Sequence, residues 1–441
     1  MVDFLQRLFW GWHVLLLILA AGAYFSWATG FYQLRCLGRW LRAALCPPEE
    51  KGGITSFQAL TAALAGSLGT GNIVGVGVAL AAGGPGALFW MWVSALLGMM
   101  TVYAENVLAA RHREAPGPLG YLRRAGRWGG VLAGVYALGC CLSSLGMGNM
   151  AQTNAAGTAL TDLGLPLWAT AAVLGLLAWA AARGGLGFGV KITQRLVPLM
   201  SLLFFGAAVW VLWDCRQNLP AALASVFREA FSLKAGAGGT LAGLTALQVG
   251  VSRGVFTNEA GLGSSAFAYD GVQGRSPEEL GCLGIFQVFA DTIVMCTVTG
   301  LCVLGSGVTG DPGTLVTAAF ESALGPWGGR AVSLSTALFA AATLTAWSCY
   351  GREGLAYLTG GRGRELYALA AGGAAVLGCF LPLGAVFQLG DAMNGLMALP
   401  NLCALFLLRR EVRGDLKAQK QKYFMENFRK KPGNFPGLMI K

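Results

Sequence analysis

The feature that most constrains this chain is a series of apolar stretches that recur from residue 11 to residue 408 with short polar breaks between them. A helix of about 20 mostly apolar residues is long enough to cross the hydrocarbon core of a bilayer. Charged residues make up only 12% of the chain, whereas soluble proteins contain about 25%. The sequence therefore predicts an all-α integral membrane protein that is embedded in a lipid bilayer.

The apolar runs and the breaks between them predict about eleven transmembrane helices. The first is expected to be a retained N-terminal anchor, because no basic region precedes it and no clear cleavage site follows it. The 11 cysteines show no metal-ligand spacing, so we expect buried free thiols and no metal centre. The expected helices span residues 11–30, 57–82, 86–110, 129–160, 166–182, 195–213, 238–252, 281–305, 330–350, 366–381 and 388–408.

The net charge of +11 does not indicate nucleic-acid binding, because the basic residues are not gathered on one face with interleaved aromatic residues. They fall in alternate loops instead. Cytoplasmic loops are enriched in Lys and Arg, which predicts an outside N-terminus and a cytoplasmic C-terminus. Arg253 is counted here among the cytoplasmic loop residues, and the few basic residues expected outside are Arg7, Arg216, Arg228, Lys234 and Arg330.

This pattern divides the chain into four parts. Residues 1–50 are expected to hold the anchor helix and a second helix, Arg35 to Cys46, whose alternating basic and apolar residues predict a position on the inner membrane surface. Residues 51–215 and 216–408 are expected to hold two five-helix repeats. Residues 409–441 form a basic tail, which we expect to be solvated or to touch lipid headgroups.

A Gly-rich polar run, Ala65 to Gly75, interrupts the second expected helix at mid-membrane. Interrupted backbone in a membrane is tolerated only where it is buried in protein or lines a cavity. Such a break frees N–H groups that suit a carboxylate and carbonyl groups that suit a cation. Close packing of small residues is the alternative interpretation.

A second Gly-rich region begins at Gly236 and runs to Ser264. It opens the second half of the chain, so the two broken helices occupy corresponding positions, as in transporters built from inverted repeats. A polar run at 146–154 contains three carboxamides, which suit a zwitterion or serve as hydrogen-bonding groups between helices. Thr343 and Trp347 lie one turn apart on another helix, either lining a site or packing in the core.

Four acidic residues, Glu105, Glu259, Asp291 and Asp391, fall in or near the apolar spans. An ionisable group in a membrane is costly unless it is paired or wetted, so each is a functional candidate. We expect structural or gating roles for Glu105, Glu259 and Asp291. Glu105 and Glu259, near basic cytoplasmic ends, are expected to form ion pairs, and Asp291 is expected to sit deep. No nucleophile, base and oxyanion arrangement is visible, so the sequence does not predict an enzyme.

Several long motifs resemble those of the alanine or glycine:cation symporter family, which belongs to the LeuT-like superfamily. The resemblance runs from about Ile54 to Leu408. It rests on Gly-Thr-Gly-Asn at 69–72, Gly-Gly-Pro-Gly-Ala-Leu-Phe-Trp-Met-Trp at 83–92, Gly-Asn-Met-Ala-Gln-Thr-Asn at 148–154, Arg-Gly-Val-Phe-Thr-Asn-Glu-Ala-Gly-Leu-Gly-Ser at 253–264 and Asn-Gly-Leu-Met-Ala-Leu-Pro-Asn at 394–401.

The resemblance implies a LeuT-like core of two inverted five-helix repeats, with broken first and sixth core helices and one extra N-terminal helix. It also implies sodium-coupled symport of alanine, D-alanine or glycine across a prokaryotic plasma membrane, with Na⁺ as the coupling ion and no organic cofactor. The implied sodium ligands are Ala65, Leu68 and Thr343. The implied substrate-binding residues are Gly69, Thr70, Gly71, Asn72, Gln152, Asn154, Gly238, Thr343 and Trp347.

The sequence departs from the family near Gly238, where an aromatic residue usually follows a Gly pair. A missing aromatic wall would enlarge the pocket, so serine, threonine or glutamine are alternative substrates. Proton coupling is an alternative to sodium coupling, although only two histidines are present and neither is expected in the core. An amino-acid sensor that binds without net transport is the alternative from a different class.

Overall fold

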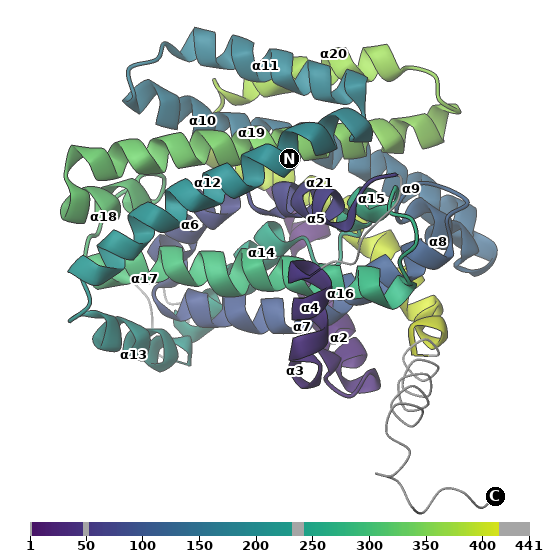
Figure 1. The fold of residues 1–441 in the computed structure, drawn as a ribbon, viewed down its shortest axis with the longest axis horizontal. Coiled ribbons are helices and arrows are strands. Elements are labelled where there is room, and N and C mark those ends of the chain that lie inside the picture. The colour runs from purple at the N-terminus through teal and green to yellow at the C-terminus, as the bar shows by residue number, and fades with distance from the viewer. Residues whose placement is uncertain (1, 47–52, 232–241, 414–441) are drawn as a thin grey trace, which may run out of the picture.

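The computed structural model describes residues 2–46, 53–231 and 242–413, and these residues are almost entirely helical (Figure 1). Two 3₁₀ turns, η1 (Thr70–Asn72) and η2 (Gly126–Trp128), and two π-helical segments, η3 (Ser144–Met150) and η4 (Phe289–Cys296), lie between α-helices. The α-helices are α1 (Val2–Trp10), α2 (Trp12–Ala28), α3 (Tyr32–Arg35), α4 (Leu37–Leu45), α5 (Ser56–Ser67), α6 (Val74–Gly83), α7 (Gly86–Arg111), α8 (Leu119–Arg124), α9 (Gly129–Ser143), α10 (Ala151–Asp162), α11 (Leu167–Gly184), α12 (Leu186–Asp214), α13 (Leu219–Ala230), α14 (Ala242–Asn258), α15 (Ser265–Tyr269), α16 (Pro277–Val288), α17 (Thr297–Ser306), α18 (Leu315–Leu324), α19 (Pro326–Thr359), α20 (Arg364–Gly378) and α21 (Leu383–Leu407).

Helices lie in all eleven ranges expected from the sequence. Among the described residues, seven helices are long and apolar enough to cross a membrane, or eight if the bent pair α5 and α6 forms one span. That the chain crosses the membrane eleven times stays a prediction. Helices α12 and α19 extend beyond the expected ranges and include Lys191 and Arg352. Long basic side chains near helix ends can reach the polar membrane surface.

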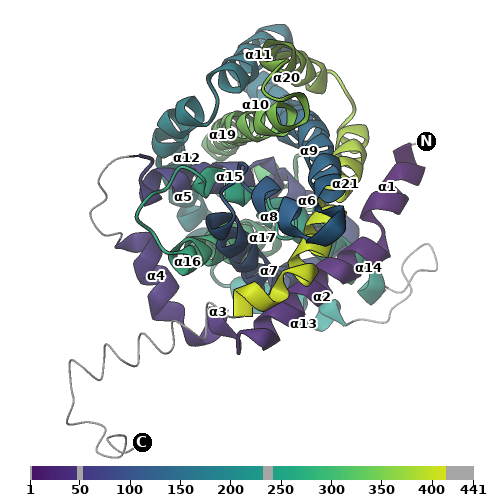
Figure 2. The same ribbon diagram turned by 90° about the vertical axis from the view of Figure 1, so that its right-hand side faces the viewer.

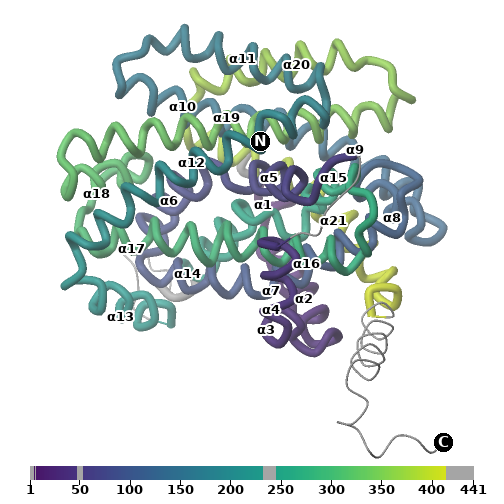
Figure 3. The backbone as a smooth tube through the Cα atoms, in the orientation of Figure 1, coloured from purple at the N-terminus to yellow at the C-terminus, as the bar shows by residue number. Residues whose placement is uncertain are grey.

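The long helices run side by side in Figure 1, with the short helices α13 and α18 at one end and α8 at the opposite end. Helix α7 packs against α14 and α16, α19 packs against α10 and α12, and α11 packs against α20. Figure 2 shows α11 and α20 together at one side of the assembly, and Figure 3 traces the chain through it. Helix α5 packs against α12 and α19, so helices from distant parts of the sequence meet there.

Helix α4 forms within the Arg35–Cys46 segment, where the sequence predicts an amphipathic helix. Trp40 is buried against the rings of Phe286 and Phe289, whereas Leu37 and Leu45 are exposed. One face of α4 is thus held on α16 and the other is free. The location of this helix at the inner membrane surface stays a prediction.

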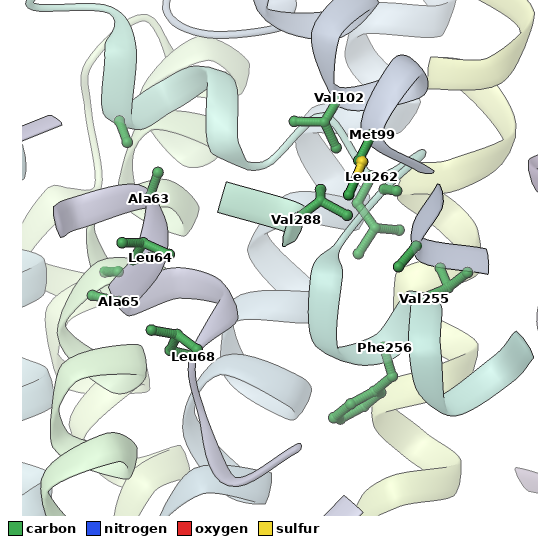
Figure 4. Close-up of a cluster of buried hydrophobic side chains, with 14 of the residues drawn as sticks. Ala63, Leu64, Ala65, Leu68, Met99, Val102, Val255, Phe256, Leu262 and Val288 are labelled. Atoms are coloured by element: carbon green, nitrogen blue, oxygen red, sulfur yellow. The ribbon is translucent and has the colours of Figure 1, made fainter. Parts of the chain in front are cut away.

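The first interruption follows the end of α5 at Ser67, where α5 and α6 meet at a bend of 59°. Leu68 ends the helix, and η1 provides one tight turn before α6. Figure 4 shows Ala65 and Leu68 at this end of α5, across from Val255 and Phe256. The interruption expected from the Gly-rich run is therefore present.

The second interruption lies between α14 and α15, at residues 259–264. Gly261 and Gly263 have φ values of 92° and 71°, a left-handed conformation that glycine adopts without steric cost. The expected opening of this region at Gly236 lies outside the described residues, and the described part, from Ala242 to Asn258, is continuous helix. The break therefore lies in the C-terminal part of this region, at residues 259–264.

The segments η3 and η4 widen two long helices at their centres. Such π-helical segments are rare and occur frequently at functional sites, because they turn side chains that an α-helix would direct elsewhere. Segment η3 ends two residues before Gln152, and η4 contains Asp291. Both of these buried polar side chains point toward the first interruption.

Candidate functional site

At the first interruption, two backbone N–H groups turn away from the helix. The Gly69 N–H donates to Asn72 Oδ1 at 2.9 Å, and the Thr70 N–H donates to Gln152 Oε1 at 3.0 Å. In a continuous α-helix these groups would bond to carbonyls four residues earlier. Those carbonyls, at the end of α5, are consequently available to other partners.

Helix α19 approaches the freed carbonyls at the end of α5. The Thr343 hydroxyl donates to the Leu68 carbonyl at 3.2 Å, and Trp347 Nε1 approaches the Gly66 carbonyl at 3.3 Å. The Ala65 carbonyl lies in the same last turn of α5 and lacks its helical donor, the Gly69 N–H. Thr343 and Trp347 therefore share a face of α19 toward α5, as their spacing predicts.

The oxygen atoms around Thr343 have the chemistry of a sodium site. Its hydroxyl also lies 3.1 Å from the Phe339 carbonyl, so two carbonyls from different helices converge on one hydroxyl. Unwound carbonyls and helix ends are typical Na⁺ ligands in transporters with broken helices. Ala65, Leu68 and Thr343 are all buried, and their donor set fits a monovalent cation.

The 69–72 segment is completely enclosed, and a side chain added at Gly69 would not fit. A Cβ atom there would lie 2.7 Å from Thr343 Oγ1 and 2.9 Å from Gln152 Oε1. The Thr70 hydroxyl is buried without a hydrogen-bond partner among the described residues. The N–H groups expected for a substrate carboxylate are partly used by protein side chains, because unsatisfied N–H groups are costly at membrane depth.

Asn154 does not join this segment, although Gln152 does. Its Nδ2 donates to the carbonyls of Gly378 and Leu381 at 3.0 and 2.6 Å. Residues two positions apart on a helix do not share a face, so the pair cannot both point at the broken helix. Gly238, the other expected substrate residue, lies outside the described residues.

Asp291 lies deep in the protein, as expected, and it contacts the first interruption directly. Asn72 Nδ2 donates to Asp291 Oδ1 at 2.8 Å and to its carbonyl at 3.1 Å. Thr292 Oγ1 donates to Asp291 Oδ2 at 2.6 Å, and the hydroxyls of Thr292 and Thr257 lie 3.4 Å apart. These polar contacts connect η1 to η4 and to the end of α14.

The ion pairs expected at Glu259 and Glu105 are absent among the described residues. Glu259 accepts hydrogen bonds from Trp347 Nε1, at 2.8 Å, and from the Ser264 hydroxyl. Glu105 Oε1 accepts from the Gly261 N–H at 3.0 Å and from Asn401 Nδ2 at 2.7 Å. The prediction was wrong because both carboxyls turn inward to uncharged donors: Glu105 to the second interruption, and Glu259, which belongs to that interruption, to Trp347 on α19.

Of the four acids, only Asp391 forms an ion pair among the described residues, and its partner is Arg253. It is a buried residue of α14 that donates to Asp391 and lies over the rings of Phe256 and Phe387, at 5.0 and 5.2 Å. Gln6 Nε2 donates to the same carboxylate at 3.0 Å. The assignment of Arg253 to a cytoplasmic loop was therefore wrong: its charge is compensated inside the protein.

Two cavities are lined by residues from opposite halves of α19. One, of about 220 Å³, lies beside the first interruption and is lined by Ile73, Val74, Asn154, Asp311 and Thr336 among others. The other, of about 240 Å³, is lined by Phe267, Asp270, Cys349, Tyr350 and Glu353 among others. Burial raises the pKa of Asp270 at the rim of the second cavity.

The expected site did not include four polar residues of this region, Thr257, Ser264, Thr292 and Asn401. Thr257 and Ser264 lie in the 253–264 motif, and Asn401 ends the 394–401 motif. Thr292 follows Asp291 directly in the sequence. The sequence signal that could have identified Thr292 is a hydroxyl residue next to an intramembrane acid, since a buried carboxyl needs donors nearby.

Comparisons with known proteins agree with this architecture. The family model for the sodium:alanine symporter family matches residues 1–431. The sodium/alanine symporter AgcS of Methanococcus maripaludis is 36% identical over 95% of this chain and 96% of its own. The probable sodium/glutamine symporter GlnT of Bacillus subtilis is 32% identical over 94% of this chain and 89% of its own.

A solved structure, that of MhsT in complex with L-phenylalanine, is similar in fold. It superposes with a TM-score of 0.56 and 18% identity, over 81% of this chain and 90% of that protein. This likeness supports a LeuT-like arrangement of helices. Together with the match along nearly the whole sequence, it leads to one conclusion: the chain is a multi-pass membrane transporter that belongs to the sodium:alanine symporter family.

Proposed function

We propose that this protein carries small neutral amino acids, with alanine and glycine as the principal substrates, into a prokaryotic cell together with sodium. The observation that supports it most is the convergence of the Leu68 carbonyl, the Thr343 hydroxyl and the N–H groups of 69–72 on one interrupted helix. Cation and carboxylate groups can both be bound there. Each ligand then stabilises the local backbone that the other needs, which is a reciprocal coupling.

In the proposed cycle, Na⁺ binds between α5 and α19 with the Ala65 and Leu68 carbonyls and the Thr343 hydroxyl as ligands. The amino acid then docks its carboxylate at Gly69–Asn72. Gln152 Oε1 lies where a carboxylate oxygen would accept the Thr70 hydrogen bond, so the incoming carboxylate replaces the Gln152 oxygen. The Gln152 amide then turns its NH₂ group toward the substrate.

We propose that transport proceeds by alternating access, which the two cavities along α19 support. The cavity beside Ile73 and Asp311 is assigned to the outside, and the cavity beside Tyr350 and Glu353 is assigned to the cytoplasm, in agreement with an outside N-terminus. The two five-helix repeats at 51–215 and 216–408 rock against each other. The bound ligands thereby become accessible first from one cavity and then from the other.

The side chain of the transported amino acid separates two candidate substrates. Glutamine is a second candidate, because one relative is named a probable sodium/glutamine symporter. The region around Gly238, which departs from the family, is proposed to shape the side-chain pocket. Competition between radiolabelled alanine and unlabelled glycine, serine or glutamine distinguishes these substrates directly.

The test is uptake of radiolabelled L-alanine into proteoliposomes, with an inward gradient of sodium or of choline. We expect accumulation that requires sodium and is blocked by excess glycine. Alanine affinity that is unchanged when choline replaces sodium would contradict sodium coupling. Binding of alanine without accumulation in sealed vesicles would indicate a sensor instead of a transporter.

Substituting Gln152 by alanine is expected to raise the KM for alanine by about 10- to 100-fold, the effect of losing a hydrogen bond to a charged group. The apparent sodium affinity should change much less, because Gln152 is not among the proposed sodium ligands. Thr161→Ala is the matched control, since Thr161 lies exposed on the same helix and bonds only within it. Equal losses in both variants would contradict the assignment.

A further inference from the structure

Glu259 is a buried carboxyl for which the proposed cycle has no role. It is only 1% exposed and has a φ of 59°, a left-handed conformation that is uncommon outside glycine. Such backbone strain persists where the surrounding structure requires it, frequently at functional sites. The conformation directs the carboxyl from the second interruption toward the first.

The carboxyl of Glu259 links the two interrupted helices. Its Oε2 lies 3.7 Å from the position that a Cβ on Gly66 would take. Trp347 Nε1 lies between Glu259 Oε1, at 2.8 Å, and the Gly66 carbonyl, at 3.3 Å. Gly66 lies in the last turn of α5, so the Glu259 carboxyl reaches this turn through Gly66 and Trp347.

No basic side chain compensates Glu259 among the residues that the structure describes. The titratable groups that act on it are Glu105 on α7, Tyr136 and Cys140 on α9, Asp291 in η4 and Tyr350 on α19. Two are further acids and none is a cation. A buried carboxylate without a countercharge is unfavourable, although the Trp347 and Ser264 donors partly stabilise the ionised form.

We propose that Glu259 is a proton-binding site of the transport cycle, which holds a proton in the absence of sodium and releases it when sodium binds. The inference rests on the proposed sodium coupling. A cation near Leu68 and Thr343 supplies the missing positive charge and favours the ionised carboxylate. The O–H bond of the carboxyl then breaks, and the proton leaves to water as one sodium ion enters, so the charge of the site is unchanged.

The proposed route for the proton passes Tyr350. A Cβ on Gly66 would lie 3.3 Å from the Tyr350 hydroxyl, and Tyr350 lines the cavity of about 240 Å³ at the proposed cytoplasmic end. Tyr350 and Phe267 stack with their ring centroids 5.6 Å apart. Tyr350 therefore connects the surroundings of Glu259 to this cavity, and movement of the two stacked rings would admit water.

The first test measures proton release by the wild-type protein in weakly buffered detergent with a pH indicator dye. Addition of sodium chloride should acidify the solution, whereas choline chloride should not, and Glu259→Gln should lose the signal. Bound radiolabelled alanine shows that the variant is folded. Sodium binding without proton release in the wild type would overturn the proposal.

The second test measures the apparent sodium affinity for alanine uptake as a function of pH. Competition with one proton makes the wild-type affinity for sodium rise by up to about tenfold per pH unit. Glu259→Gln should be insensitive to pH, Glu259→Asp should keep a pH dependence, and the exposed surface variant Glu365→Gln should behave as the wild type. A pH dependence that persists in Glu259→Gln would overturn the proposal, whereas absent sodium-driven uptake in the wild type would overturn the proposed function itself.

Discussion

Gly69→Ala is expected to reduce sodium-driven alanine uptake by about 100-fold or more, because displacement of positioning groups by about 1 Å has an effect of this order. The new methyl group would lie 2.7 Å from Thr343 Oγ1 and 2.9 Å from Gln152 Oε1. It would therefore separate the proposed sodium ligand on α19 from the proposed substrate ligand on α10. The initial rate of uptake in proteoliposomes measures this effect.

The matched control is Gly206→Ala on α12. Nothing lies within 4 Å of a Cβ atom at Gly206, and alanine is the better helix former. This variant should transport as the wild type does. Wild-type uptake by Gly69→Ala would show that the 69–72 segment does not bind the ligands, whatever the result at Gly206.

Thr343→Val is expected to weaken the apparent sodium affinity by about 10- to 100-fold, the range found when groups that support a bound metal are removed. Valine has nearly the shape of threonine but lacks the hydroxyl that bonds to the Leu68 and Phe339 carbonyls. The volume of the site is thus kept while one oxygen ligand is lost. Alanine uptake measured against sodium concentration gives the affinity.

Two further variants separate the proposed ligand role of Thr343 from a packing role. Thr343→Ser restores the hydroxyl and should recover most of the sodium affinity. Thr345→Val removes a neighbouring hydroxyl that bonds at 2.7 Å to Ala341 in its own helix, and it should leave the sodium affinity unchanged. If Thr345→Val and Thr343→Val behave alike, the Thr343 hydroxyl is not a sodium ligand.

Much of the first interruption was predictable from local composition. The small and polar residues of 65–75 predict a break, and the break is present at Leu68–Asn72. The spacing of Thr343 and Trp347 predicts a shared face, and both reach carbonyls of α5. These predictions succeeded because each depends on neighbours along the chain or on one helical turn.

Predictions that depended on distant partners succeeded less often. The sequence places Gln152 and Asn154 in one polar run, but only Gln152 reaches the broken helix, since helical geometry directs Asn154 to Gly378 and Leu381. Arg253 resembles a loop residue because basic residues flank most membrane helices. Its carboxylate partner, Asp391, lies on the last long helix, a pairing that no local pattern reveals.

The sequence by itself determined that this protein is a bundle of membrane helices with Gly-rich interruptions, because hydrophobic length and helix-breaking residues act locally. Only the tertiary structure decided where the buried polar groups are satisfied. It turned Glu105 to the second interruption, turned Glu259 to Trp347, and placed Asp291 against Asn72. The physical reason is that a buried carboxyl must find donors wherever the packed helices present them, and those donors come from residues far away in the chain.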